Sequence, residues 1–364
     1  MKKVVFFVTS LNSGGIENYL LRFLTHYEGQ IEPIVICKGN AFGELEEEYK
    51  KIQHIRLIKK NIGYFNFFAF IAVYKFLKKE KITAVCDFTG NFAGLILWVA
   101  NLAKIKTRVA FYRGSTNHFK ETKFRLFYNK LMLFLVKENA TSILSNSQSA
   151  FNFFYKNKSK YDSRFKVIYN GIDAQKFKSK TVTYKKEDFG IPENAFVIGH
   201  TGRYNSAKNH KTIINVANNI CKKYDSIYFV LCGKDTDVCL KDEVALNPIL
   251  KDKVKLLGYR NDVPSVLTIF DLYFFPSITE GQPNSLIEAM ISGLPIIASN
   301  IEPIIETTPT EIHKDLKNPL DVEEFTKLME DFYLNNKEEN QDFSDWAIQK
   351  FNPDVLFNKF FIEL

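Results

Sequence analysis

The sequence predicts an α/β protein with two parallel sheets, each in a domain of its own. Short apolar runs alternate with longer amphipathic stretches along the first 170 residues, and a second series of the same kind begins near residue 195. This alternation is typical of buried parallel strands separated by helices. A length of 364 residues also suits two domains with a core each.

The elements follow from the position of each apolar run. In the first half, strands are expected at Val4–Val8, Ile34–Cys37, Ala84–Cys86, Val109–Phe111, Ser142–Leu144 and Val167–Tyr169, with helices such as Glu17–Thr25, Phe65–Lys79 and Lys123–Lys137 between them. In the second half, they are expected at Phe196–His200, Tyr228–Leu231, Val254–Leu257, Leu272–Phe275 and Pro295–Ala298. We therefore expect domains at 1–170 and 195–342, a polar linker at 171–194, and a C-terminal helix at 343–364.

The composition excludes several classes of protein. Its 46% hydrophobic and 25% charged content is ordinary for a globular chain, and no run of about 18 uncharged apolar residues predicts a membrane span. The apolar run after Met1 is too short for a signal peptide, so we expect a cytoplasmic protein. Five cysteines at scattered spacings, with no C-x-x-C, predict neither a disulfide framework nor a zinc site.

The net charge of +8 is unevenly divided. Residues 1–170 contain 27 Lys+Arg and 12 Asp+Glu (+15), and residues 171–364 contain 22 and 29 (−7). A basic half suggests an anionic partner: nucleic acid, an anionic membrane surface or a phosphorylated substrate. Nucleic acid is the least favoured, because the cations are dispersed and no recognised motif is present.

The basic helix expected at 120–137 allows two interpretations. Its apolar residues Phe124, Phe127, Tyr128, Leu131, Phe134 and Leu135 recur at helical spacing. The favoured interpretation packs this apolar face on the sheet, as in an ordinary α/β domain. The surplus of Lys and Arg would then meet an anionic membrane surface, on the inner face of the cytoplasmic membrane, or an anionic acceptor.

Two glycine-containing turns could bind an anion. Gly14 and Gly15 lie between the first strand and a helix expected to begin near Ile16. The pair lacks the third glycine and the acidic residue of a dinucleotide fingerprint, so a simple tight turn is the alternative. Gly202 and Arg203 follow the first strand of the second half, and Lys208 precedes a helix. These two cations suit a diphosphate, or are solvated loop residues.

The segment from Pro276 to Ala289 carries more information. Pro283 is expected at the first position of a helix, with Glu280 on the loop before it and Glu288 inside it. The free N–H groups of Asn284, Ser285 and Leu286 would form an anion site between two carboxylates. Since carboxylates repel phosphate, they would bind hydroxyl groups, which suits a diphosphate between two sugars. The alternative is a solvated Glu280 and a surface Glu288.

The same segment, E-G-Q-P-N-S-L-I-E-A-M-I-S-G-L-P-I-I-A-S, resembles the signature of the retaining glycosyltransferases of family 4, which have the GT-B fold. Further similarities are S-G-G-I-E at 13–17, V-I-Y-N-G-I-D at 167–173, G-R-Y-N-S-A-K-N-H at 202–210, L-L-G-Y-R-N-D-V at 256–263 and D-L-Y-F-F-P-S at 271–277. The resemblance implies two Rossmann-like domains facing a central cleft, a C-terminal helix that crosses back to the first domain, and a role in bacterial capsule, exopolysaccharide or lipopolysaccharide assembly.

The resemblance also assigns roles to residues. It implies a nucleotide-sugar site made of Gly15, Gly202, Arg203, Lys208, Arg260, Glu280, Gly281, Asn284, Ser285, Leu286 and Glu288. Glu288 would hold the ribose. Glu280 would contact the donor sugar and support the reacting centre, and Arg203 and Lys208 would bind the diphosphate and neutralise the leaving group, so these three residues are catalytic candidates. It implies front-face displacement with retention, without a metal or another cofactor, onto a glycan or lipid-diphosphate-linked saccharide.

One loop departs from the family pattern. Many relatives read A-H-S-H there, whereas this chain has Arg113 in place of a histidine. His118 could supply the missing group, so Arg113 and His118 are acceptor-side candidates and His118 also a catalytic one. A surface histidine is the alternative. Other functions left open are a nucleotide-sugar epimerase or phosphorylase on this fold, a non-catalytic sugar-binding subunit, and a nicotinamide oxidoreductase.

Overall fold

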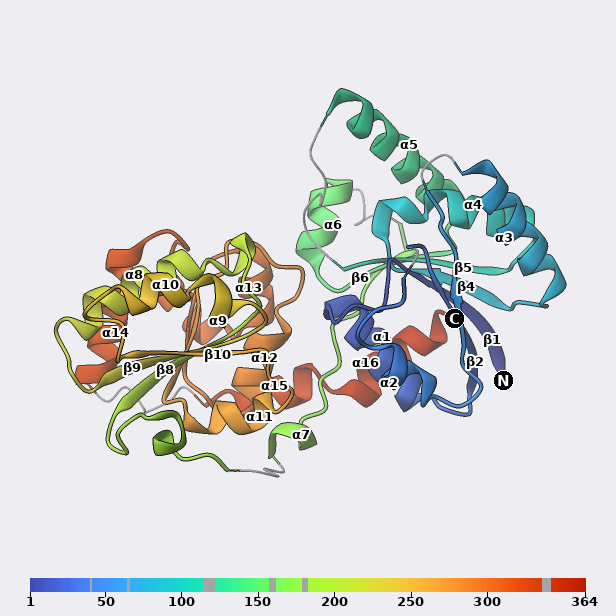
Figure 1. The fold of residues 1–364 in the computed structure, drawn as a ribbon. Coiled ribbons are helices and arrows are strands. Elements are labelled where there is room, and N and C mark those ends of the chain that lie inside the picture. Colours follow the sequence, from blue (N-terminus) through green and yellow to red (C-terminus); the bar gives the residue numbers. More distant parts are fainter. Residues whose placement is uncertain (40, 64–65, 114–121, 157–161, 179–182, 336–341) are drawn as a thin grey trace. The chain divides into compact units, whose positions relative to one another are not determined.

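The computed structural model describes residues 1–364 except 40, 64–65, 114–121, 157–161, 179–182 and 336–341. The chain divides into two compact units, one formed by residues 1–171 with 353–364 and the other by residues 172–352 (Figure 1). Of the linker expected at 171–194, residue 171 belongs to the first unit and residues 172–194 group with the second unit. They include the helix α7 (Gln175–Lys178) and the 3-10 turn η3 (Lys186–Phe189).

The first unit is built on a parallel sheet of seven strands. Their order is β3 (Arg56–Lys59), β2 (Ile31–Cys37), β1 (Lys2–Val8), β4 (Ala84–Asp87), β5 (Thr107–Tyr112), β6 (Ser142–Ser145) and β7 (Phe165–Val167). The central strand β1 pairs Val5 with Ile34 of β2 and with Val85 of β4. The sequence did not predict β3, because this edge strand is partly exposed and flanked by Arg56 and Lys59.

Helices cover both faces of this sheet. One core joins Val4, Phe6 and Val8 to α1 (Gly15–His26), α2 (Glu46–Lys50) and α16 (Pro353–Ile362). The opposite core joins Val5 and Phe7 to α3 (Phe67–Lys79), α4 (Gly94–Leu102), α5 (Lys123–Asn139) and α6 (Gln148–Tyr155). The short 3-10 turn η1 (Gly90–Ala93) leads into α4. The alternation of buried side chains along β1 therefore serves two cores.

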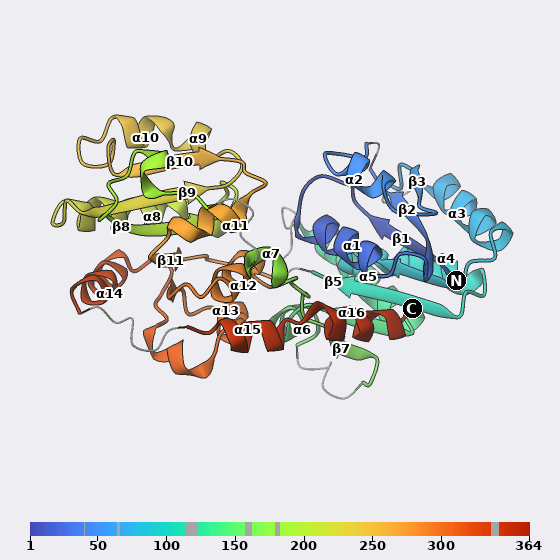
Figure 2. The same cartoon turned by 90° about the horizontal axis from the view of Figure 1, so that it is seen from below.

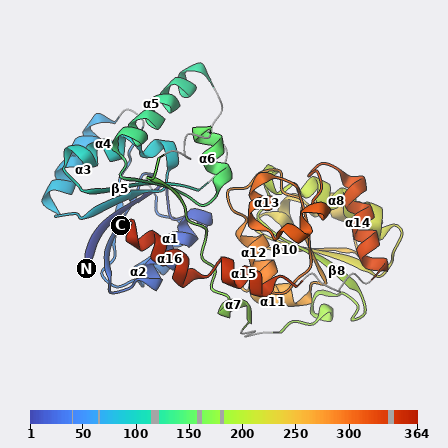
Figure 3. The ribbon, with the colours of Figure 1, turned by 180° about the vertical axis from the view of Figure 1, so that it is seen from behind.

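The C-terminal segment forms two helices and not the single helix expected at 343–364. The first, α15 (Ser344–Lys350), belongs to the second unit, and α16 belongs to the first. The break precedes Pro353, which disfavours a helical residue before it and suits the first turn of a new helix. On α16, the ring of Phe360 packs 4.5 Å from Phe23 of α1, so the two helices lie side by side (Figure 3).

The helix α5 corrects the favoured interpretation of its apolar face. Four of the six residues expected on the sheet are exposed to solvent: Phe124, Phe127, Leu131 and Phe134. The inward face carries the buried Met132 and Val136, together with Asn129 and Asn139, which accept hydrogen bonds from Asn91 (2.8 Å) and Asn101 (3.0 Å). Helical spacing identified an apolar stripe, but these asparagine pairs hold the other side of the helix against the domain.

The second unit has a parallel sheet of five strands. Their order is β10 (Val254–Gly258), β9 (Ile227–Cys232), β8 (Phe196–Thr201), β11 (Leu272–Phe275) and β12 (Ile296–Ala298). The helices α8 (His210–Cys221) and α14 (Val322–Leu334) pack on one face in a common core. The remaining elements are η4 (Ser206–Lys208), α9 (Thr236–Cys239), α10 (Lys241–Ala245), α11 (Val263–Val266), η5 (Leu267–Ile269), α12 (Asn284–Ile291), α13 (Glu302–Thr307) and η6 (Thr310–Asp315). Figure 2 shows α9 and α10 near the edge strand β10.

Both sheets reverse their strand order next to a central strand. The reversal lies between β1 and β4 in the first unit and between β8 and β11 in the second. Ligands of open parallel sheets bind beyond the carboxyl ends of the strands at such a point. None of the helices in the described part of the chain combines the length and apolar character that crossing a bilayer requires.

Candidate functional site

In the second unit, glycines bring the loops after β8 and β9 into contact. Gly202 donates from its backbone N–H to the carbonyl of Cys232 (2.9 Å), and Tyr204 donates to the carbonyl of Lys234 (2.8 Å). A Cβ atom added to Gly233 would lie 2.0 Å from the carbonyl oxygen of Gly202. Only glycine fits there, so this close approach fixes the position of the Gly202 loop at the end of β8.

Lys208 and Glu280, predicted as separate contacts to a ligand, form an ion pair. The Nζ atom of Lys208 lies 2.7 Å from Oε1 of Glu280 and 4.6 Å from the centre of the Phe275 ring. Both side chains are mostly buried, with 16% and 12% of their surface exposed. Asn205 positions the lysine, since its side chain accepts a hydrogen bond from the Lys208 N–H. The structure thus joins two loops that are 72 residues apart in sequence.

Arg203 differs from Lys208 in its surroundings. Its side chain is exposed. Within the described ranges, no hydrogen bond or ion pair involves its guanidinium group. A charged fork in this state can bind an anion without first giving up a protein partner.

The helix α12 begins one residue later than predicted. Pro283 is its N-cap and not its first residue, because its ψ of 91° is extended and not helical. The first intrahelical bond runs from the Ile287 N–H to the Pro283 carbonyl (3.2 Å). The N–H groups of Asn284, Ser285 and Leu286 precede this bond and form the helix N-terminus. Gly281 and the buried Gln282 make the loop that leads into it.

Ser285 and Glu288 lie near a buried tyrosine. The Tyr273 hydroxyl is hydrogen bonded to Oγ1 of Thr201 (2.7 Å), and Ser285 also interacts with it. Burial raises the pKa of Tyr273, and the nearby charge of Glu288 raises it further. Glu288 is half-buried. The hydroxyls of Thr201, Tyr273 and Ser285 therefore connect β8, β11 and α12 beside this carboxylate.

Arg260, which was expected in the nucleotide-sugar site, is held by protein partners. It donates from Nε to Asp262 (2.7 Å) and from Nη2 to the Tyr184 hydroxyl (2.8 Å). Tyr184 in turn donates to Asp262 (2.7 Å). Hydrogen bonding to Arg260 lowers the pKa of Asp262 to about 2, so the carboxylate stays ionised. A ligand would have to share Arg260 with these two groups.

Two buried histidines, His200 and His210, were not predicted to belong to the site. The His200 ring lies 5.2 Å from that of His210, and both are almost fully buried. Nδ1 of His200 is 2.9 Å from the Phe274 carbonyl oxygen. Burial lowers the pKa of His200 strongly, and burial together with Lys208 lowers that of His210 to about 4. Both rings are therefore neutral at pH 7. The signal in the sequence was a histidine at the end of an apolar strand and another two residues after Lys208.

In the first unit, the structure brings Arg113 to the glycine turn. The helix α1 begins at Gly15, and Nη2 of Arg113, at the end of β5, lies 3.4 Å from the Gly15 carbonyl. The guanidinium carbon is 3.9 Å from the centre of the Tyr19 ring. Burial lowers the pKa of Arg113 to about 10, so it remains a cation at pH 7. Within the described residues, its buried Nε and Nη1 have no hydrogen-bond partner.

A buried ion pair lies at the strand-order reversal of the same sheet. Nζ of Lys38, just after β2, is 2.6 Å from the carboxylate of Asp87 at the end of β4. Thr89 donates to that carboxylate (2.7 Å) and accepts from Lys38 (2.8 Å). This cluster was not predicted from the sequence, although both charged residues directly follow an apolar run.

Two other expectations concern His118 and metals. His118 lies outside the described residues. Across the described ranges, no group of three or more His, Cys, Asp or Glu side chains could hold a metal ion.

Comparisons with known proteins agree over most of the chain. Residues 13–176 match the family model described as Glycosyltransferase Family 4, and residues 182–350 match the one described as Glycosyl transferases group 1. The UDP-Gal:alpha-D-GlcNAc-diphosphoundecaprenol alpha-1,3-galactosyltransferase of Escherichia coli is 30% identical over 239 residues, which are 64% of this chain and 61% of that protein. The capsular polysaccharide biosynthesis glycosyltransferase CapH of Staphylococcus aureus is 28% identical over 307 residues, 83% and 82% of the two chains. The crystal structure of Anabaena HepE in complex with UDP superposes with a TM-score of 0.82 at 18% identity, covering 99% of this chain and 98% of HepE.

Proposed function

Because the chain belongs to the glycosyltransferases of family 4 and group 1, and has their GT-B fold, we propose that it transfers a sugar from a nucleotide-diphosphate sugar to a saccharide acceptor with retention of configuration. The observation that carries this proposal is the Lys208–Glu280 pair, which lies in the two loops at the strand-order reversal of the second sheet. A cation and a carboxylate held 2.7 Å apart suit a donor whose reacting bond separates opposite charges.

The diphosphate of the donor binds between two loops of the second unit in this proposal. Arg203 supplies an exposed fork and Lys208 a compact charge. The N–H groups of 284–286 at the start of α12 add a third set of donors, since a helix N-terminus favours an anion. The half-buried carboxylate of Glu288 accepts hydrogen bonds from the ribose hydroxyls.

The charges of the Lys208–Glu280 pair match those that develop during transfer. As the bond from the anomeric carbon to the phosphate oxygen breaks, the oxygen takes the electron pair and the sugar becomes positive. Lys208 stabilises the leaving phosphate and Glu280 the positive sugar. The acceptor hydroxyl attacks the same face and passes its proton to the departing phosphate oxygen. The chain supplies the cations for the leaving group, so we propose that no metal or other cofactor is required.

The acceptor is proposed to be a lipid-diphosphate-linked saccharide in bacterial surface polysaccharide synthesis. The E. coli relative is named for a diphosphoundecaprenol acceptor and a UDP-galactose donor, and the S. aureus relative for capsular polysaccharide biosynthesis. Arg113, whose Nε and Nη1 atoms have no hydrogen-bond partner among the described residues, is proposed to bind an anionic group of the acceptor. A UDP-sugar is the first donor to test.

The test combines a donor screen with variants. Melting temperature is measured with UDP-, GDP-, ADP- and CMP-sugars, and transfer is measured with and without EDTA. Glu288→Ala should weaken donor binding, and Glu280→Gln should lower kcat more than it changes donor Kd. The exposed Glu323→Gln on α14 should alter neither. A donor converted without acceptor would identify an epimerase. No stabilisation by any nucleotide sugar would contradict the proposal.

A further inference from the structure

The outward side of α5 is an aromatic stripe that faces solvent. Phe124, Phe127, Leu131 and Phe134 follow one another at intervals of three, four and three residues, which places them on one side of a helix. Their exposed fractions are 63%, 69%, 44% and 57%. Exposed apolar side chains in such a row indicate a contact surface, because monomeric proteins rarely leave large apolar patches in water.

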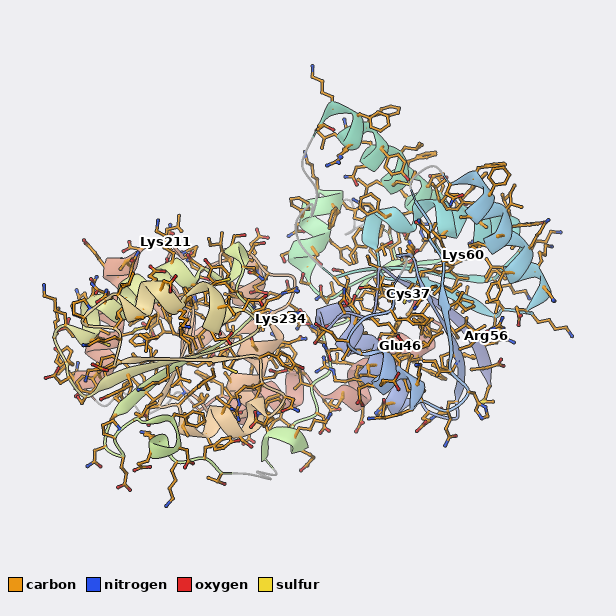
Figure 4. The ribbon with its side chains drawn as sticks, viewed as in Figure 1. Cys37, Glu46, Arg56, Lys60, Lys211 and Lys234 are labelled. Carbon is orange, nitrogen blue, oxygen red and sulfur yellow. The ribbon has the colours of Figure 1, made fainter. Side chains whose placement is uncertain are left out.

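The neighbouring helices continue this surface. The helix α4 packs against both α3 and α5, and the inward residues of all three belong to one core. Side chains project outward from α3 and α5 in Figure 4. We call this outward side the α3–α5 face; its exposed apolar residues are Phe67, Phe68, Ile71, Tyr74, Trp98, Leu102, Phe124, Leu126, Phe127, Leu131 and Phe134.

Close packing holds the stripe outward. A Cβ atom added to Gly94 at the start of α4 would lie 2.6 Å from the Met132 carbonyl oxygen of α5, so the two backbones nearly touch. Together with the Asn91–Asn129 and Asn101–Asn139 hydrogen bonds, this contact fixes the rotation of α5. Burying the stripe within the unit would break both pairs.

The α3–α5 face is also strongly cationic. The three helices contain seven basic residues and one acidic residue, Glu138. The basic residues, all exposed, are Lys75, Lys78, Lys79, Lys123, Arg125, Lys130 and Lys137. Long cationic side chains beside exposed rings can reach phosphate groups while the rings enter an apolar layer.

We propose that the α3–α5 face docks on the surface of an anionic lipid bilayer. The rings of α3 and α5 enter the boundary between headgroups and acyl chains, and the Lys and Arg side chains bind lipid phosphates. This surface spans three helices, beyond the single basic helix predicted from the sequence. A second copy of the chain fits less well, because a symmetric pairing would set like charges against each other. Single-stranded nucleic acid fits less well because Ile71, Leu102 and Leu131 offer no stacking surface.

Docking on a bilayer does not depend on the proposed reaction. Docking would also place the enzyme beside a lipid-linked acceptor, and only that consequence rests on the proposed function. Donor binding in solution is expected to be unaffected by the variants below, so failure of docking and failure of the donor site are distinguishable.

The first test is co-sedimentation of the full chain with vesicles of phosphatidylglycerol and phosphatidylcholine, and of phosphatidylcholine alone. Phe124→Ser/Phe127→Ser/Phe134→Ser should lower the partition coefficient by at least about tenfold. A matched control, Val238→Ser/Leu246→Ser, changes residues of the second unit that are 70% and 84% exposed and should bind as the wild type does.

The second test separates charge from apolar contact. Lys123→Gln/Lys130→Gln/Lys137→Gln should lower partition onto anionic vesicles by about a hundredfold. Lys211→Gln/Lys222→Gln/Lys251→Gln, three exposed lysines of the second unit, should have little effect. An equal loss of partition in the two lysine variants would overturn the proposal, since it would indicate binding through net charge alone.

A third readout is specific to the face. The chain has two tryptophans, so Trp346→Phe leaves Trp98 of α4 as a single reporter within the α3–α5 face. Its emission should shift to the blue with anionic vesicles and be quenched by brominated lipids. An unchanged emission, no binding to phosphatidylglycerol, or serine substitutions that instead abolish self-association or RNA binding would each overturn the proposal.

Discussion

Acidification should destabilise the second unit through His210. Its ring is 2% exposed and lies 5.2 Å from the buried ring of His200. Burial and the nearby Lys208 lower its pKa to about 4, against about 6.5 in an unfolded chain. Between pH 6.5 and pH 4, His210 is therefore protonated in the unfolded chain but neutral in the folded unit. The contribution of this neutral ring to the free energy of unfolding is complete above pH 6.5 and is lost progressively towards pH 4.

The size of this loss follows from the two pKa values. Between pH 8 and pH 5, the difference in proton binding lowers the free energy of unfolding by about 2 kcal/mol. His200, whose pKa is also lowered by burial, adds to the loss. In a His210→Gln variant, the pH dependence should shrink by about 2 kcal/mol while the contribution of His200 remains.

The assay is urea unfolding at pH 8 and pH 5 in a Trp98→Phe background, where the fluorescence of Trp346 reports on the second unit. His54→Gln changes an exposed histidine of the first unit and should leave the pH dependence as it is. The reasoning is refuted if His210→Gln keeps the full pH dependence, or if NMR titration places the pKa of His210 near 6.5.

Three further substitutions test a close backbone contact, a buried ion pair and the proposed acceptor role of Arg113. Gly233→Ala should lower the free energy of unfolding by about 2 to 3 kcal/mol in urea melts, because its Cβ would lie 2.0 Å from the Gly202 carbonyl oxygen. Lys38→Met should cost about 3 to 5 kcal/mol by leaving Asp87 buried without its cation, and adding Asp87→Asn should recover part of that loss. Arg113→Met should lower kcat/KM for an anionic acceptor about tenfold while the donor Kd is unchanged; equal loss with a neutral acceptor would contradict an acceptor role.

The fold was predictable where burial acts on both faces of a strand. The runs around Val4–Val8 and Leu272–Phe275 are apolar throughout, because the side chains on both faces of each strand are buried. The edge strand Arg56–Lys59 lacks this signal, since exposure allows charged residues at both its ends. The break between the two C-terminal helices is set by Pro353, whose backbone restriction outweighs the apolar spacing on either side.

The sequence was sufficient to predict which loops form the candidate site, but not which side chains pair within it. Lys208 and Glu280 follow neighbouring strands of a parallel sheet, so their proximity could be expected once the strand order was known. That they pair with each other, and that Arg260 pairs with Asp262, depends on side-chain geometry that no spacing encodes. The predicted orientation of α5 was wrong for a related reason. Periodicity identifies a stripe on a helix, but only contacts such as Asn91–Asn129 decide which side faces the core.

The chain passes from the first unit to the second and then returns to the first, and this order has a consequence for its biosynthesis. The core of the first unit includes Phe357, Phe360 and Leu364, which leave the ribosome after all 181 residues of the second unit, 172–352. At about 5 to 20 residues per second, the nascent first unit waits roughly 10 to 40 seconds before Phe357 and Phe360 can pack on the rings of Tyr19 and Phe23. Because synthesis runs from the N-terminus, all residues of the second unit are available before those of the first. The first unit is therefore begun first but is the last to complete its core.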